Sequence, residues 1–279
     1  MHGDFHDRAM ERINQLAFAV MVAGIVLLLA LVAWRGYVDR HRSQQGIAPQ
    51  VEQVRSAVVH VSKQGPNGPE CQGSGCIIDP EGIIFTAKHI TDHRPGEYVV
   101  TLDDGKTTYQ VKYAVEDKDH DVAFLLLDLP AGVKLPAVPL ADLATMRVGD
   151  AVFTMGSPLG SFNRNSVSLG ILSAMQRDLE SAVPLGYGWR IMFQADNPGV
   201  YPGNSGGPVF NMAGEVVGVL VAVAGPGLNY SVPVAVFKNR LDAVRTWFAL
   251  SRFVPVPEEV PEVIVTTEEL FDETGLMPR

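Results

Sequence analysis

The feature that most constrains the fold is a series of short apolar stretches between Val51 and Leu250. Each stretch is about four to eight residues long, and Gly, Pro, Asn and Asp separate the stretches at intervals of about 8–15 residues. Few segments between them have helical spacing, so the pattern predicts an all-β sandwich or barrel. Residues 234–250 differ, because their apolar positions recur at helical spacing and predict a helix that closes the domain.

A second feature is the segment Ile13–Trp34, which contains 22 residues and no charged side chain. As a helix it would be about 33 Å long, enough to cross a bilayer, and it is apolar on every face. A cleavable signal peptide is the alternative, but the apolar run is longer than a typical signal core and Leu31-Val32-Ala33 is a poor cleavage site. We therefore expect an uncleaved transmembrane anchor at 13–34. Two arginines flank it on one side and three on the other, so charge does not decide its orientation.

These features divide the chain into a short N-terminal flank at 1–12, the anchor, a polar linker at 35–50, a folded domain at 51–250 and a tail at 251–279. Residues 253–279 include seven acidic residues, four prolines and one basic residue. This composition is typical of a solvated, largely disordered segment.

Charge and cysteine content exclude several classes of function. The formal net charge is −9, and the 22 Lys and Arg residues are scattered, so no basic patch predicts nucleic-acid binding. Cys71 and Cys76 are five residues apart and would point to opposite faces of a continuous strand, which disfavours a disulfide. Two cysteines also give too few soft ligands for a zinc site, and no metal or organic cofactor is implied.

A glycine-rich loop, Gly203-Asn204-Ser205-Gly206-Gly207, is the main candidate for chemistry. A serine between glycines exposes its hydroxyl while neighbouring backbone N–H groups converge on one point. By itself such a loop is more often an ordinary turn. Because serine alone is a poor nucleophile, the interpretation requires a base and an orienting acid elsewhere.

His89 is the best candidate base among the seven histidines, because it follows the apolar stretch Gly82–Phe85 after a short turn. His60 lies within an apolar stretch and is interpreted as structural. Asp121 directly precedes the apolar stretch 122–127 and is the candidate acid, with Asp119 as the second choice.

The order His, Asp, Ser over two sets of strands resembles the chymotrypsin-type serine proteases, and more narrowly the HtrA/Deg family with its membrane-anchored, DegS-like members. The resemblance covers about residues 51–250. The matching stretches are Gly73–Asp79, Phe85–Ile90, Asp121–Leu125, Val148–Asp150, Met155–Gly160, Ser168–Ala174, Gln194–Asp196, Pro202–Pro208 and Tyr230–Pro233.

The resemblance implies a chymotrypsin-like double β-barrel with a C-terminal helix, preceded by one transmembrane helix. It implies a serine endopeptidase whose catalytic triad is His89, Asp121 and Ser205. The oxyanion hole would be formed at Gly203, Asn204 and Ser205. Tyr230, Ser231 and Val232 would line the substrate pocket, and an extended substrate would add a β-strand at that edge.

The same resemblance implies polypeptide substrates, a role in envelope protein quality control or regulated proteolysis, and a homotrimer. It places the anchor in the inner membrane and the protease domain on the periplasmic side. Members of the family usually carry a C-terminal PDZ domain, whereas only the acidic tail follows residue 250 here. We therefore expect activity without PDZ control.

Two other functions fit parts of the sequence. An inactive member could act as a membrane-bound scaffold that binds peptides, although His89, Asp121 and Ser205 are all present. A metal site could use His89, His93 and Asp121, but His-x-x-x-His spacing suits a helix and this segment is predicted as strand and turn.

Overall fold

The computed structural model divides the chain into two units, Met1–Ala48 and Pro49–Arg279. It describes residues 20–21, 23–35, 46–65, 68–91, 98–182, 186 and 188–251. In the first unit residues 23–35 are helical. Within the described residues, no helix combines the length and the apolar character needed to span a membrane. The rest of the expected anchor at 13–34 and the expected tail from residue 252 onward lie outside the described residues.

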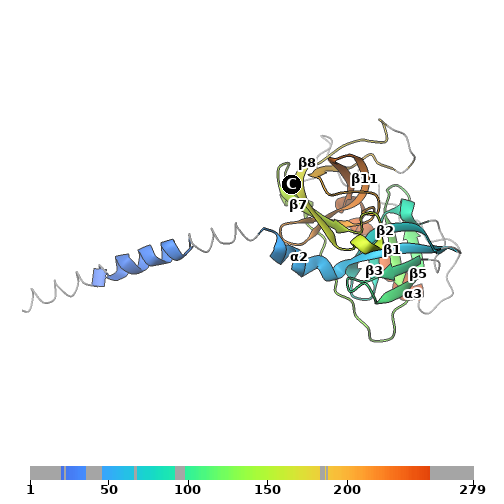
Figure 1. Cartoon of the computed structure of the whole chain (residues 1–279), viewed down its shortest axis with the longest axis horizontal. Coiled ribbons are helices and arrows are strands. Elements are labelled where there is room, and N and C mark those ends of the chain that lie inside the picture. Colours follow the sequence, from blue (N-terminus) through green and yellow to red (C-terminus); the bar gives the residue numbers. More distant parts are fainter. Residues whose placement is uncertain are drawn as a thin grey trace, which may run out of the picture. The chain divides into compact units, whose positions relative to one another are not determined.

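The described part of the second unit forms two closed antiparallel barrels of six strands each (Figure 1). The first barrel has the strand order β1-β2-β3-β6-β5-β4, and the second has the order β10-β11-β12-β9-β8-β7. The first contains β1 (Val58–Gly65), β2 (Gly68–Asp79), β3 (Ile83–Thr86), β4 (Tyr98–Thr101), β5 (Thr108–Glu116) and β6 (Ala123–Leu127). The second contains β7 (Ala151–Gly156), β8 (Ser166–Ala174), β9 (Phe193–Asn197), β10 (Pro208–Asn211), β11 (Val216–Gly225) and β12 (Gly227–Pro233). The predicted all-β double barrel is confirmed.

Buried strands hold the two segments that carry the candidate base and acid. Every residue of β3 and β6 is buried, and the two strands pair from Ile83↔Leu126 to Thr86↔Ala123. Because both faces of these strands are buried, their sequences are almost continuously apolar and do not alternate between apolar and polar residues. The residues that follow β3 and those that precede β6 therefore lie at the same end of the first barrel.

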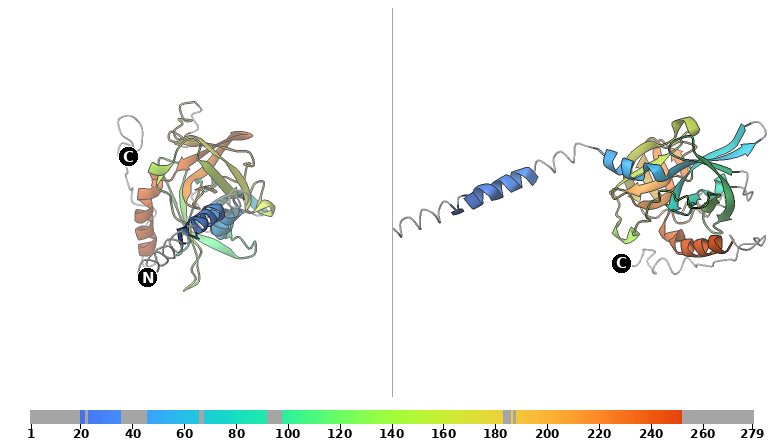
Figure 2. Two further views of the ribbon diagram at one scale, coloured as in Figure 1. Left: turned by 90° about the vertical axis from the view of Figure 1, so that its left-hand side faces the viewer. Right: turned by 90° about the horizontal axis from the view of Figure 1, so that it is seen from below.

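Helix α3 (Ala235–Ser251) follows the last strand of the second barrel and packs on the first (Figure 2). The Phe237 ring lies 6.1 Å from that of Phe85 and 5.9 Å from that of Phe124, so α3 contacts β3 and β6. The predicted closing helix at 234–250 is thus confirmed, and it fastens one barrel to the other. The shorter helices are α2 (Ala48–Val54), η1 (Arg55–Ala57), η2 (Lys88–Ile90), η3 (Leu143–Thr145) and η4 (Ser161–Asn163).

His60 is a buried member of β1, and only 3% of its surface is exposed. Its ring is hydrogen-bonded to the backbone of Gly73, whereas its Nδ1 has no partner among the described residues. Burial and the nearby charge of Arg164 lower the pKa of His60 to about 4. His60 is therefore a neutral core residue, as its apolar context predicts.

The cysteines give no sign of a disulfide in the described part of the chain. Cys76 is a free, fully buried thiol, and burial raises its pKa well above the ordinary value. The side chain of Cys71 lies outside what the structure describes.

Candidate active site

His89 lies in the 3₁₀ helix η2, one turn after β3 ends at Thr86. Its side chain is 23% exposed, so the ring is partly accessible while its backbone is held by the barrel. The imidazole Nδ1 lies 2.7 Å from Oδ2 of Asp121, and the His89 backbone N–H donates to Oδ1 of Asp121 at 2.9 Å. The predicted base and acid are therefore in direct contact.

Asp121 lies just before β6, and its side chain is fully buried. A third donor reaches it from a distant part of the chain, because the indole Nε1 of Trp189 donates to Oδ2 at 3.1 Å. A buried carboxylate requires such donors to replace its lost hydration. Asp119, the second choice for the acid, is 47% exposed and pairs instead with Arg240.

The Asp117 carboxylate anchors the loop that leads into this acid. The backbone N–H groups of Asp119 and His120 donate to it at 2.9 Å each, and Nδ1 of His120 lies 3.2 Å away. Arg240 of α3 forms an ion pair with the same carboxylate. Burial of Asp117 opposes ionisation, but the hydrogen bond from His120 and the charges of His120 and Arg240 outweigh it and lower the pKa of Asp117. The Lys88 ammonium donates to the Asp117 carbonyl at 2.9 Å, so the loop is also tied to η2.

Ser205 lies in the tight loop between β9 and β10, where the two barrels meet. The Ser74 N–H of the first barrel donates to the Ser205 carbonyl at 2.8 Å, and the Gly206 N–H donates to Leu220 of the second barrel at 2.7 Å. Gly206 has φ +83°, and a Cβ there would lie 2.2 Å from Oγ1 of Thr86 and 2.7 Å from the Ala87 nitrogen. The serine loop therefore packs directly on the residues that precede the candidate base, and only glycine fits at this contact.

The backbone of the serine loop is fixed on each side of Gly203. The Leu159 N–H donates to the Pro202 carbonyl at 2.7 Å, and the Ser74 hydroxyl donates to the Gly203 carbonyl at 2.8 Å. The Asn204 N–H is engaged with the Tyr201 carbonyl at 3.0 Å. Among described residues, the N–H groups of Gly203 and Ser205 donate to no partner. Two of the three predicted oxyanion-hole positions thus have an available N–H.

The predicted substrate-binding residues Tyr230, Ser231 and Val232 are buried in β12. Tyr230 and Ser231 pair with β9 on one side and with β11 on the other, so an extended peptide has no open edge there. The expectation of strand addition at β12 is therefore wrong. Among the described strands, the nearest edge without a partner belongs to β11, because its pairing with β10 ends at Val219 and the strand continues to Gly225.

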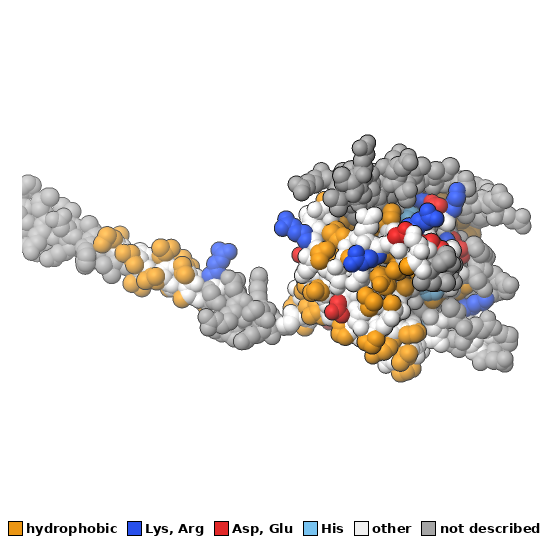
Figure 3. Space-filling model, turned by 90° about the horizontal axis from the view of Figure 1, so that it is seen from above, with side chains coloured by type: hydrophobic (Ala, Val, Ile, Leu, Met, Phe, Trp, Pro, Cys, Tyr) orange, Lys and Arg blue, Asp and Glu red, His pale blue; other side chains and the backbone are white. Residues whose placement is uncertain are grey.

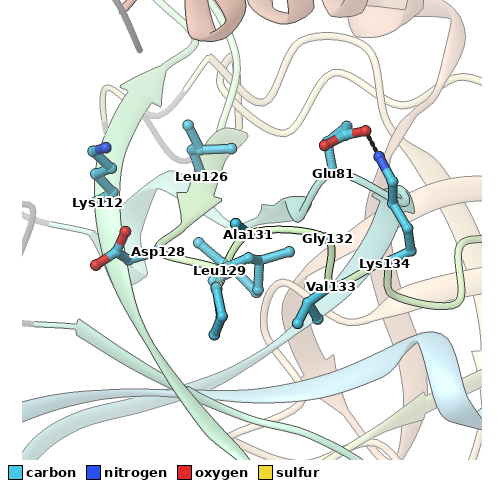
Figure 4. Close-up of a pocket in the computed structure, with 11 residues that line it drawn as sticks. Glu81, Lys112, Leu126, Asp128, Leu129, Ala131, Gly132, Val133 and Lys134 are labelled. Carbon is cyan, nitrogen blue, oxygen red and sulfur yellow. Dashed lines mark ion pairs between the residues drawn. The ribbon is translucent and has the colours of Figure 1, made fainter.

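A separate pocket of about 250 Å³ lies in the first barrel, at the end of β6 and the segment 128–134 (Figure 4). Glu81 and Lys134 form an ion pair beside it. None of the predicted catalytic residues lines this pocket. Within the described residues, no group of three or more His, Cys, Asp or Glu side chains could hold a metal ion, and His93 of the alternative metal site lies outside them.

Comparison with known sequences identifies the family. Residues 73–219, which make up more than half of the chain, match the trypsin-like peptidase domain. The chain belongs to the trypsin-like peptidase family. Within this family of peptidases, its relatives include the serine protease HhoA of Synechocystis sp., which is 35% identical over 189 residues, covering 67% of this chain and 45% of the relative.

Two further relatives of this trypsin-like peptidase carry related names. A protein of Rhizobium meliloti named as a periplasmic serine endoprotease, DegP-like, is 32% identical over 223 residues, covering 74% of this chain and 42% of the relative. Protease Do-like 1, chloroplastic, of Arabidopsis thaliana is 34% identical over 171 residues, covering 60% of this chain and 37% of the relative. The resemblance to HtrA/Deg serine proteases is confirmed, and the chain spans less than half the length of these relatives.

Proposed function

We propose that this chain is a serine endopeptidase in which Ser205 is the nucleophile, His89 the general base and Asp121 the orienting acid. The observation that carries the proposal is the buried Asp121 carboxylate 2.7 Å from His89 Nδ1, with the Ser205 loop packed on the residues before His89. Ser205 Oγ attacks the peptide carbonyl while His89 takes its proton, and His89 then protonates the leaving amine. Water hydrolyses the resulting acyl-enzyme by the same proton transfers in reverse order.

The N–H groups of Gly203 and Ser205 would stabilise the oxyanion that forms on the attacked carbonyl. The bonds from Leu159 and Ser74 support this proposal, because they fix the peptide groups on either side of Gly203. Such preorganised donors contribute on the order of 10²–10³ in turnover. The Asn204 N–H is already engaged, so Asn204 would act as the spacer between the two donors.

An extended substrate would pair with the open edge of β11 after Leu220. Val223 on this edge is 41% exposed, and Leu220 itself is bonded to Gly206 and Gly207 beside the nucleophile. Strand addition at this position would place a peptide next to Ser205.

The decisive experiment uses the full-length chain in detergent. We expect cleavage of casein, and covalent labelling of Ser205 by a serine-directed phosphonate, with both lost in Ser205→Ala. A folded wild-type chain that binds peptides but neither cleaves nor labels would instead identify the scaffold function. Zinc in stoichiometric amount by elemental analysis would favour the metal-site alternative.

The anchor at 13–34 would hold this protease domain at the inner membrane, on the periplasmic side. The uncharged apolar run supports the anchor, and the names of several relatives place those proteins in the periplasm. The acidic segment 251–279 would extend on the same side. A reporter fused after Arg279 should be active only outside the cytoplasm, and activity confined to the cytoplasm would contradict this topology.

Exposed apolar side chains support association of the protease domain, which the family resemblance gives as a homotrimer. Figure 3 shows apolar side chains gathered in several places on one face of the protease unit. Phe162 is 80% exposed and Leu159 is 62% exposed. Exposed apolar side chains that form a patch are typical of protein–protein interaction sites. Sedimentation equilibrium should give a trimer that Phe162→Ala weakens, and a monomeric wild-type chain would refute the assembly.

A further inference from the structure

The Asp121 carboxylate receives hydrogen bonds from both barrels. His89 supplies two donors, its backbone N–H to Oδ1 at 2.9 Å and its Nδ1 toward Oδ2 at 2.7 Å. Trp189 supplies the third, its indole N–H to Oδ2 at 3.1 Å. Asp121 leads into β6 of the first barrel, whereas Trp189 precedes β9 of the second and is 68 residues away in sequence.

The Trp189 bond differs from the other two because it does not come from the residue that the acid must orient. The indole N–H is a donor only and carries no proton that titrates in catalysis. It therefore keeps Oδ2 turned toward the imidazole whether His89 is neutral or protonated. Among the described residues, His89 is the one other residue that donates to this carboxylate.

The chain holds Trp189 in place for this contact. The Leu179 and Glu180 N–H groups donate to the Trp189 carbonyl at 2.8 and 3.2 Å. The preceding residue, Gly188, has φ +69°, and a Cβ there would lie 1.7 Å from the Asp119 carbonyl oxygen. Glycine at 188 thus allows the backbone to lie against the loop that carries the acid.

We propose that Trp189 is a positioning residue for the catalytic acid: its indole N–H fixes the Asp121 carboxylate in the orientation that the His89 imidazole requires. The inference rests on the proposed protease function. It also makes the segment before β9 a part of the catalytic apparatus of the other barrel.

The first test is Trp189→Phe, which keeps an aromatic ring and removes the N–H. Loss of one hydrogen bond to a charged group should lower kcat by about ten- to a hundredfold and leave KM within about twofold. The matched control is Trp247→Phe in α3, because the ring contacts of Trp247 among the described residues are with Tyr113 at 5.7 Å and Phe248 at 5.2 Å, neither of which is a proposed catalytic residue. An unchanged kcat in Trp189→Phe would overturn the proposal, as would a raised KM at constant kcat, which indicates a substrate contact.

A second variant separates the hydrogen bond from packing. Replacement of Trp189 by benzothienylalanine keeps the shape of the indole and exchanges the N–H for sulfur. We expect the same fall in kcat as in Trp189→Phe, with an unchanged melting temperature. Full activity of this isostere beside an impaired Phe variant would show that only packing matters and would overturn the proposal.

A third readout does not depend on catalysis. The chain has three tryptophans, so the Trp189 indole N–H resonance can be assigned by its loss in Trp189→Phe. Asp121→Asn, which removes the charge of the acceptor, should shift this resonance, and an unmoved resonance would refute the contact. A wild-type chain that cleaves nothing would refute the protease function itself, and the resonance would still report whether the N–H···carboxylate bond exists.

Discussion

Acidification should destabilise the protease domain through one buried histidine, His60. The pKa of His60 is about 4 in the folded chain and 6.5 when the ring is free in water. The two values differ by about 2.5, which at about 1.36 kcal/mol for each pKa unit corresponds to about 3 kcal/mol. The sign follows from proton binding, because between pH 6.5 and 4 the unfolded chain holds the proton and the folded chain does not. This contribution to stability is complete above pH 6.5 and is lost as the pH falls through about 4.

The measurement is urea unfolding of the Ser205→Ala chain between pH 7 and 4, since this background prevents self-cleavage. The comparison is the same chain with His60→Gln, whose side-chain amide can still donate to the Gly73 backbone but cannot titrate. The free energy of unfolding should fall by about 3 kcal/mol more in the chain that keeps His60. Other acid-sensitive groups, including Asp117, are common to both chains and cancel.

Parallel pH profiles of the two chains would refute this reasoning. They would mean that His60 titrates alike in the folded and unfolded states, through water or a partner at Nδ1. A difference that developed only above pH 6.5 would also contradict it, because the unfolded chain takes up no proton there.

Two further predictions concern the loops around the site. Arg240→Met should destabilise the domain by about 3 kcal/mol and lower kcat, because it removes the arginine partner of the buried Asp117 carboxylate. Arg245→Met removes ion pairs of an arginine that is itself 42% exposed, and should cost within about 1 kcal/mol by the same urea titration. Equal losses in the two variants would contradict the role of burial. Gly206→Ala should abolish phosphonate labelling, because its Cβ would overlap Thr86 and Ser74, whereas Gly132→Ala, with φ +81° but open space around it, should label normally. Normal labelling of Gly206→Ala would show that the loop can move without loss of the site.

The sequence predicted the parts of the site that depend on local pattern. His89 follows the fully buried strand β3, and Asp121 precedes the fully buried strand β6. Because these two strands pair in antiparallel orientation, the end of β3 and the start of β6 lie side by side, and so do His89 and Asp121. Ser205 was recognisable from the glycines around it, which the loop requires for close backbone contacts. The double barrel followed from the short apolar stretches together with the family resemblance.

The remaining contacts depend on packing between distant segments and left no local pattern. Trp189 reaches Asp121 across 68 residues, and Arg240 reaches Asp119 across 121. Ser74 lies within a matching stretch, but its hydroxyl bond to Gly203 is visible only in the folded chain. Strand addition at β12 was predicted wrongly because the sequence does not reveal that both neighbouring positions are occupied by β9 and β11.

The position of Arg240 has a consequence for the order in which the chain matures. Arg240 lies in α3, the last element of the described fold, yet it holds the loop that carries the acid of the first barrel. During synthesis both barrels emerge before this helix does, so the acid-bearing loop lacks its arginine until the domain is almost complete. The buried Asp117 carboxylate therefore gains its arginine partner only when α3 has docked, after the strands of both barrels have been synthesised.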